Sequence, residues 1–263
     1  MSQHWYDREG NPCHKQPNKS KPGTFRDTTI TDARKLGLLP SVSGITKMLA
    51  APGLETYKMK EVAKQCFQNP PHPGEEMEPY IQQMLEKSKE DGSEAADIGT
   101  IIHDALECHF TGEQRKQESV KIGHTEYHID TFVHPAVKLI EENGWEIVAS
   151  EKVLVNAKEG YAGTTDLIIK TRDGISGIAD FKSKRTKPGK PVFHSETHPC
   201  QLAAYSMAHW GHIGYGANIY ISTTEPGRVE LKEYSALELH SAWLAFLAMR
   251  DLFIFTTSYD PRQ

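Results

Sequence analysis

GISGIADFKSKRTKPGK (residues 174–190) begins as an apolar β-strand and ends in a run of basic residues. Side chains on one face of a strand recur at every second residue, so Asp180 and Lys182 point the same way, with Ile178 beside them. Strand interiors disfavour aspartate. An acid and a base on the same face of a strand that is otherwise suited to burial therefore indicate a functional site.

The preceding strand (residues 161–170, YAGTTDLIIK) carries a second acid, Asp166, and the turn TRDG joins the two strands. A two-residue loop would pair Asp166 with Phe181, and the two acids would face apart. A three-residue loop over Arg172–Gly174, with the glycine at positive φ, places Asp166 directly opposite Asp180. We predict the odd-length loop, or a bulge with the same effect.

Two carboxylates opposite each other in a hairpin lie roughly 5 Å apart at Cβ, and like charges at that distance raise one pKa. A divalent cation relieves this repulsion, and magnesium takes one or two protein carboxylates together with water or phosphate oxygens. A neighbouring lysine can orient a water and stabilise charge that builds on phosphorus. The alternative is that Asp166 and Asp180 are surface acids at strand ends, with Lys182 as a salt-bridge partner.

Asp166 followed by Asp180-Phe181-Lys182 resembles the D…(D/E)xK signature of the PD-(D/E)XK nuclease superfamily, and in particular its RecB-like exonuclease branch. Further segments match in the same order, over about residues 95–210: GTIIHDALE, GYAGTTD and QLAAY. PSVSGITKML, near residue 40, is similar to a segment of phage-encoded members and of the mitochondrial genome maintenance exonuclease.

The resemblance implies a set of metal ligands. Asp166, Asp180 and the backbone carbonyl of Phe181 would hold the catalytic metal, with His103 as a further ligand. Glu151, on the first strand, is a candidate for a secondary metal or water contact, with a plain surface glutamate as the alternative. The cation would be Mg²⁺ or Mn²⁺, since oxygen ligands suit both and a histidine tilts the choice toward manganese.

The resemblance also implies catalytic roles for residues outside the metal site. Lys182 would position the attacking water, and Gln201 and Tyr205, one helical turn apart, would face the scissile phosphate or the metal. Gly99 would leave room for close approach one turn before the histidine. The alternatives are a structural His103 and packing roles for the glutamine and tyrosine.

The implied fold is α/β: a restriction-endonuclease-like αβββαβ core with a mixed central sheet and a helical N-terminal annex. Residues 1–38 read as an extended polar arm, residues 39–144 as a helical annex that includes the His103 helix, and residues 145–263 as the nuclease core, in one compact unit. Ser43 is a plausible N-cap of the first helix. Separate helices are expected over 76–91 and from about 91 to Gly112, after a proline-rich break.

The basic run supplies a DNA-binding surface. Lys184, Arg185, Lys187 and Lys190 follow the catalytic strand in a segment that a Pro-Gly pair keeps out of a helix. Such a loop would neutralise phosphates flanking the site, and phosphate contacts carry little sequence preference. The alternative is a solvated charge run.

The net charge and the distribution of apolar residues indicate which partners and which cellular location to expect. The net charge of −5 means that any anionic partner is held by a local patch rather than by the field of the whole protein. The N-terminus has no apolar leader, and Arg250 and Asp251 interrupt the last apolar segment, so we expect a cytoplasmic protein without a membrane partner, in a bacterial host cell if it is phage-encoded.

The four cysteines are scattered and form no CxxC pair, which favours reduced structural thiols over zinc. Some RecB-like members carry an iron–sulfur cluster that uses three cysteines near the C-terminus. No cysteine follows Cys200, so no such cluster is expected. No Walker A sequence is present either.

These features predict a metal-dependent DNA nuclease, an exonuclease of phage or bacterial DNA replication or recombination, with a phage replication or recombination protein as a possible partner. The alternatives are a structure-selective or site-specific endonuclease of the same fold, a catalytically silent DNA-binding scaffold protein, and a zinc-binding module. The sequence leaves polarity, strand preference and oligomeric state open.

Overall fold

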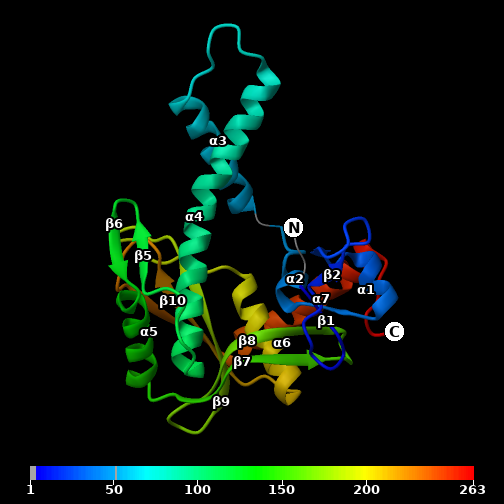
Figure 1. The fold of residues 1–263 in the computed structure, drawn as a ribbon. Helices are drawn as coiled ribbons and strands as arrows, with labels where there is room; N and C mark the ends of the chain where they lie inside the picture. The colour runs from blue at the N-terminus through cyan, green and yellow to red at the C-terminus, as the bar shows by residue number, and fades with distance from the viewer. Residues whose placement is uncertain (1–3, 51) are drawn as a thin grey trace.

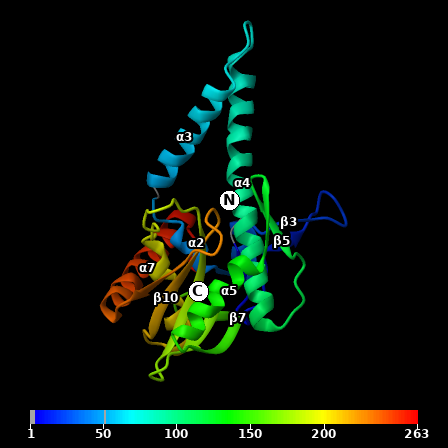
Figure 2. The same ribbon diagram turned by 90° about the vertical axis from the view of Figure 1, so that its left-hand side faces the viewer.

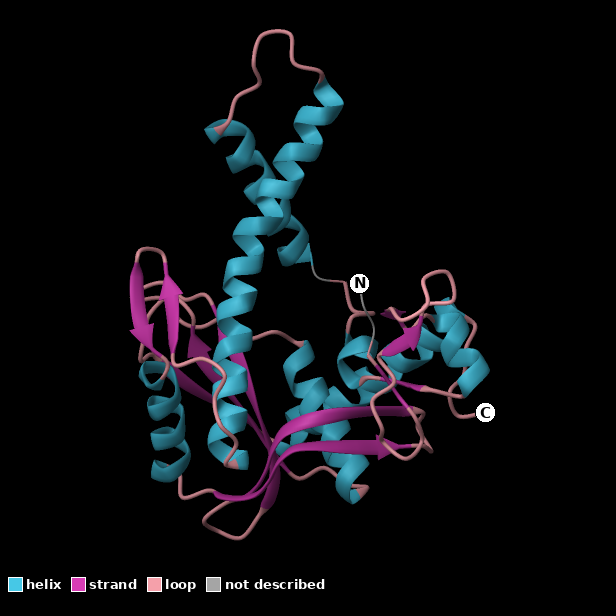
Figure 3. Ribbon diagram, in the orientation of Figure 1, coloured by secondary structure: helices cyan, strands magenta, loops and turns pink. Residues whose placement is uncertain are grey.

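A computed structural model describes residues 4–50 and 52–263 of the chain. Its centre is a five-stranded mixed sheet in the order β11–β10–β9–β8–β7 (Figures 1 and 3). The strands of this sheet are β7 (Glu146–Asn156), β8 (Tyr161–Lys170), β9 (Ser176–Lys184), β10 (Tyr215–Ser222) and β11 (Val229–Tyr234). β10 runs parallel to β9, and all other neighbours are antiparallel.

Helices cover both faces of the sheet. α4 (Met77–Thr111) and α5 (Asp130–Glu142) lie on one face, and α6 (Thr197–Trp210) and α7 (Ala236–Thr257) on the other (Figures 1 and 2). Successive side chains of a strand point to opposite faces of the sheet and so contribute to two separate cores. Leu167 and Ala179 pack toward α4 and α5, and Ile168 and Ile178 pack toward α6 and α7. Because α6 makes the crossover between the parallel strands β9 and β10, the chain has the predicted αβββαβ order.

A helical hairpin stands away from the sheet. α3 (Pro52–Gln68) packs on the N-terminal part of α4, and the loop between them forms the far tip (Figures 1 and 2). The prediction of two helices over residues 76–112 is wrong, since α4 is continuous. No proline lies between Tyr80 and Thr111, so nothing removes a backbone hydrogen bond there.

The N-terminal region is more structured than predicted. Its short elements are β1 (Trp5–Tyr6), β2 (Lys15–Pro17), β3 (Phe25–Asp27), α1 (Ile30–Leu36), β4 (Leu39–Pro40) and α2 (Val42–Thr46). The expectation of an extended arm over 1–38 is wrong for α1, which Thr29 and Asp32 start with a reciprocal capping box. Trp5 is buried in the core beside α7, so this region is part of the main body.

Two local predictions also need correction. Ser41, not Ser43, caps α2, because its side chain accepts a hydrogen bond from the backbone N–H of Gly44. A hairpin of β5 (Ser119–Ile122) and β6 (Thr125–His128), turning at Gly123, was not predicted. Its strands are too short to show a clear alternating pattern.

α7 is long and apolar enough to cross a membrane by length and composition alone. In the structure one side of it lies in the core, where Trp243, Phe246 and Phe253 are buried. Arg250, also buried, pairs with Glu159. These contacts are those of a core helix in a globular domain.

Candidate active site

The hairpin of β8 and β9 has the predicted register. Lys170 pairs with Ser176 and Leu167 pairs with Ala179, so Asp166 lies opposite Asp180 in the next position. Gly174 closes the turn at φ 81°, where its N–H donates to the carbonyl of Thr171. The prediction of an odd-length loop is therefore confirmed.

The two strands stop pairing at the acids. Beyond Leu167 and Ala179, β9 continues only along β10. Oδ2 of Asp166 accepts a hydrogen bond of 2.7 Å from the backbone N–H of Phe181, in place of a ladder hydrogen bond. Burial and the charge of Asp180 raise the pKa of Asp166 well above its usual value. The gap thus holds two neighbouring carboxylates that disfavour joint ionisation.

A third carboxylate comes from β7. Glu151 lies between Ser150 and Lys152, whose partners flank Asp166, so it stands beside that acid in the sheet. Its φ of 48° is unusual for a residue with a side chain. Burial, followed by the charges of Glu107, Asp180 and Asp104, raises the pKa of Glu151 to about 7.

Asp180 is 4% exposed and has two partners on its own face of the sheet. Nζ of Lys182 lies 2.5 Å from its Oδ2, and Nδ2 of Asn218 lies 3.2 Å from the same oxygen. Burial alone lowers the pKa of Lys182, but the charges of Asp180 and Asp166 outweigh it, and the net shift is upward. The lysine therefore stays charged beside the acids.

α4 brings His103 to the same gap. Its Nδ1 lies 4.0 Å from Oδ2 of Asp166, and its ring meets that of Phe181 edge-on. Burial lowers the pKa of His103, which favours the neutral form that a metal ligand requires. One turn earlier, a Cβ on Gly99 would lie 3.1 Å from the side chain of Ser183, so the glycine lets α4 approach β9 closely.

α6 approaches from the opposite face. Tyr205 is buried, and a Cβ on Gly163 would lie 3.2 Å from its hydroxyl oxygen. Burial, and then the charges of Asp180 and Asp166, raise the pKa of Tyr205 well above its usual value. Its hydroxyl therefore remains a hydrogen-bond donor close to the acids. Gln201 is half-buried one turn earlier on the same side of α6.

The basic loop continues directly from β9. Lys184 is half-buried, and burial followed by the charge of Lys182 lowers its pKa. Arg185, Lys187 and Lys190 are exposed. Arg228 holds the loop in place, because its guanidinium donates to the carbonyls of Lys187 (3.2 Å) and Lys190 (2.6 Å). The structure thus brings Asp166, Asp180, Lys182, His103, Glu151 and Tyr205 together, with Gln201 one turn from Tyr205 and the basic loop continuing from the end of β9.

The donors fit a hard divalent cation, although no group of three or more His, Cys, Asp or Glu within residues 4–50 and 52–263 is arranged ready to hold one. Asp166, Asp180 and Glu151 bring three carboxylates together, and burial first, followed by the charges of the neighbouring acids, raises the pKa values of Asp166 and Glu151. Oδ1 of Asn218 is a buried acceptor beside them without a hydrogen-bond partner in the described chain. A bound cation would neutralise the neighbouring carboxylates, and one of its water molecules would donate a hydrogen bond to Oδ1 of Asn218.

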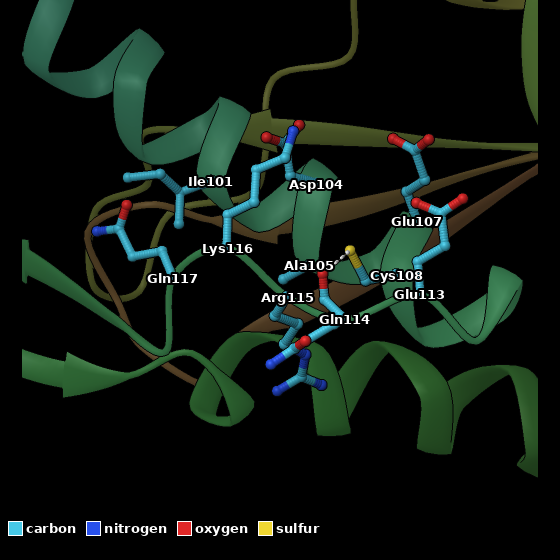
Figure 4. A pocket seen from close by; sticks show the side chains of 10 residues that line it. All are labelled: Ile101, Asp104, Ala105, Glu107, Cys108, Glu113, Gln114, Arg115, Lys116 and Gln117. Carbon is cyan, nitrogen blue, oxygen red and sulfur yellow. Dashed lines mark hydrogen bonds between the residues drawn. The ribbon is translucent and has the colours of Figure 1, made fainter.

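A pocket of about 240 Å³ lies between the C-terminal part of α4 and residues 113–117 (Figure 4). Asp104 and Glu107 line it, and the charges of both act on Glu151. Arg115 closes its lower side in the view and pairs with Asp130 at 2.5 Å. The pocket and Glu151 thus share the influence of two carboxylates on α4.

Replacing Glu151 by glutamine should stabilise the metal-free protein in alkaline solution. Because the folded-state pKa of Glu151 is raised from 4.5 to about 7, its destabilising effect is absent at pH 4, develops between about pH 4.5 and 7, and is complete above pH 7. We expect a gain of about 1 kcal/mol, roughly 2–4 °C in Tm, at pH 8 in EDTA. Glu146→Gln, at an exposed position of the same strand, is the control. Equal Tm values of wild type and Glu151→Gln at pH 8 would contradict this account.

Sequence reasoning missed Asn218. The signal was present, because asparagine, like aspartate, is disfavoured in strand interiors, and YGANIYIS is otherwise apolar around it. Asn218 contacts Asp180 only because β10 pairs with β9, and α6 separates these two strands in the sequence.

A family model described as the PD-(D/E)XK nuclease superfamily matches residues 79–249, about two thirds of the chain. A search of curated proteins found no match. Distantly similar solved structures include the following two. The crystal structure of SSO0001 shares 16% identity and covers 79% of this chain and 89% of its own, with a TM-score of 0.31. An alkaline exonuclease, LHK-Exo from Laribacter hongkongensis, shares 15% identity, with a TM-score of 0.28. The match covers 63% of this chain and 89% of the LHK-Exo chain. At these scores neither likeness bears on function.

Proposed function

Since the chain belongs to the PD-(D/E)XK nuclease superfamily, we propose that it is a metal-dependent DNA exonuclease of the RecB-like branch. The observation that carries the proposal is the gap between β8 and β9, where Asp166, Asp180 and Lys182 meet His103 and Tyr205. Acids, a charged lysine and a buried hydroxyl donor converge there on one place. Each of these groups can serve the hydrolysis of a phosphodiester, by holding a metal ion, by orienting water or by stabilising negative charge.

Asp166, Asp180 and the carbonyl of Phe181 would hold a Mg²⁺ or Mn²⁺ ion, with His103 beside them and Glu151 as a more distant contact. Such an ion, when bound, supplies a water of lowered pKa and neutralises charge on the phosphate. Lys182, fixed by Asp180 at 2.5 Å, orients the attacking water and stabilises the negative charge of the transition state. No covalent enzyme intermediate is needed.

Tyr205 and Gln201 act on the phosphate. The raised pKa keeps the hydroxyl of Tyr205 protonated at neutral pH, so it donates a hydrogen bond to a non-bridging oxygen. Gln201 lies on the same side of α6 and extends the contact along the strand of DNA. Both residues therefore position the scissile group against the water that Lys182 orients.

The basic loop binds the flanking phosphates. Lys184, Arg185, Lys187 and Lys190 extend from the end of the catalytic strand, and Arg228 fixes the loop backbone. Nη1 of Arg185 also lies 3.5 Å from the hydroxyl of Tyr57 on α3, which links this surface to the protruding hairpin. A strand end held between the loop and α3 suits exonuclease action.

Removing the exposed charges of this loop should weaken DNA binding without changing the chemistry. For Arg185, Lys187 and Lys190 all replaced by glutamine, we expect the slope of log K against log salt to fall by roughly 2–3, because each neutralised phosphate contributes about 0.7–0.9. The measurement is fluorescence anisotropy in EDTA over a salt series. Lys19, Lys21 and Lys35, also exposed, give a matched triple substitution that should leave the slope unchanged. Equal slopes for the two triple variants would show that this loop does not contact DNA.

A nuclease assay on 5′- and 3′-labelled single- and double-stranded DNA, with Mg²⁺ or Mn²⁺ and with EDTA, tests the function. Stepwise release of nucleotides from labelled ends supports an exonuclease and gives its polarity. Internal cuts would instead favour an endonuclease of the same fold. DNA binding without cleavage under any condition would favour a silent scaffold. The proposed setting is phage or bacterial DNA replication or recombination in the cytoplasm.

A further inference from the structure

Asn218 is a fully buried polar residue for which the proposed chemistry has given no role. It lies on β10, is 0% exposed, and stands next to Asp180 in the parallel register of β9 and β10. Its neighbours along the strand, Ala217 and Ile219, pack into the apolar core. A polar side chain at such a position requires partners, and its partners lie in the acidic gap.

Both donor contacts of Asn218 go to one residue. Nδ2 lies 3.2 Å from Oδ2 of Asp180 and 3.3 Å from the backbone carbonyl of the same residue. Turning the amide over would place its oxygen against two other oxygens, so the donor orientation is fixed by its surroundings. Lys182 reaches the same Oδ2 from the next position of β9.

Nδ2 of Asn218 and Nζ of Lys182 both contact Oδ2 of Asp180, and neither contact involves Oδ1. These two contacts fix the rotamer and the plane of the Asp180 carboxylate. We propose that Asn218 is a positioning residue: it holds Asp180 through Oδ2 so that Oδ1 is kept free to bind the divalent cation. This inference rests on the proposed metal-dependent function.

The acceptor side of the amide supports the same role. Oδ1 of Asn218 is buried and unpaired in the described part of the chain. A core residue whose only task was to join β9 to β10 would be better served by an apolar side chain, because an unmade buried hydrogen bond is unfavourable. The unpaired oxygen is suited to a water molecule, and a hydrated cation brings one to this place.

The test uses the full-length protein with two substitutions, Asn218→Leu and Asn218→Ala. Leucine has the same number of side-chain heavy atoms as asparagine and a similar branched shape, but no donor, so it covers the case in which the alanine cavity prevents folding. Thr223→Val is the control, because Thr223 is also buried, follows β10 directly, and has a hydroxyl without a partner in the described residues. The probe is Mn²⁺ alone, with its dissociation constant measured by electron paramagnetic resonance.

We expect Mn²⁺ to bind at least about 10-fold more weakly to both Asn218 variants, as for other residues that orient metal ligands. Thr223→Val should bind Mn²⁺ like the wild type. DNA affinity in EDTA should be the same in all four proteins. In cleavage, the half-saturating metal concentration should rise by a similar factor, with a smaller change in KM for DNA.

Mn²⁺ affinity within twofold of wild type in a folded Asn218 variant would overturn the inference. This outcome is distinct from failure of the proposed function, in which the wild type binds Mn²⁺ but cleaves no DNA. In that case the binding data would still show whether Asn218 positions Asp180. A wild-type protein that binds no Mn²⁺ would overturn both.

Discussion

Lys182→Ala is expected to reduce DNA cleavage by about 10²–10³-fold, the cost of removing one group that stabilises transition-state charge. The lysine stands at the centre of the site, with Nζ 2.5 Å from Asp180 and its side chain 21% exposed. Its charge is kept by both acids, which raise its pKa against the effect of burial. Single-turnover cleavage of labelled DNA at saturating metal is the measurement.

Metal affinity distinguishes a catalytic lysine from a structural one. Lys182 pairs with Oδ2 of Asp180, and its positive charge repels a cation at the acids, so its removal should leave Mn²⁺ binding unchanged or make it tighter. A lysine that only held the fold together would, on removal, lower Tm and metal affinity along with activity. Lys182→Met, which keeps most of the side-chain volume, separates packing from charge.

The control for this prediction is Lys170→Ala, at an exposed position on the other end of β8. It removes one positive charge from the same sheet but lies at the turn end of the hairpin, away from the acids. Cleavage by this variant should match the wild type. Lys182→Ala activity within tenfold of wild type, with the control also intact, would rule out the proposed role.

The acidic pair was predictable because its geometry is local. A period-two pattern, a turn with glycine in its last position and a short sequence separation together place Asp166 opposite Asp180, and the structure has that register. The same reasoning gave the order of strands and helices in the core. These features depend on residues within one hairpin or one helix.

The parts that sequence reasoning missed depend on contacts between distant segments. Asn218 reaches Asp180 only because β10 pairs with β9 in one particular parallel register, which the crossover through α6 does not encode. Trp5 belongs to the core only because β1 pairs with β4 and the rings of Phe253 and Tyr259 pack on it. Polar composition around residue 5 gave no sign of that burial.

Asp166→Asn is expected to abolish cleavage, by about 10³-fold or more, and at the same time to stabilise the metal-free protein. Asparagine keeps the shape of the side chain and can still accept the hydrogen bond from the N–H of Phe181. It removes a carboxylate that burial and Asp180 already disfavour in its charged form. Activity and stability should therefore change in opposite directions.

The pH dependence follows from the direction of the shift. Because the folded-state pKa of Asp166 is raised, the folded protein binds more protons than the unfolded chain, from about pH 4 up to that raised value. The stability of the metal-free wild type therefore falls as pH rises through this window, and Asp166→Asn removes that loss. In EDTA the variant should melt at a higher temperature at pH 8 and close to the wild type at pH 3.

Asp130 provides a control of opposite sign. Its hydrogen bond to Arg115 lowers its pKa, so its contribution to stability is present above pH 4 and is lost as the pH falls. Asp130→Asn should therefore lower Tm at pH 8, although it removes the same charge. A general effect of net charge would shift both variants in the same direction.

Divalent cations complete the test, because they bind the folded state. At a concentration 100 times the dissociation constant, Mn²⁺ should stabilise the wild type by about 2.7 kcal/mol. Asp166→Asn, having lost one of the carboxylates that hold the ion, should show little of this gain, and Asp130→Asn should keep it. A cation that raises the Tm of Asp166→Asn as much as that of the wild type would place the metal elsewhere. The gap between β8 and β9 would then lose its role as the metal site.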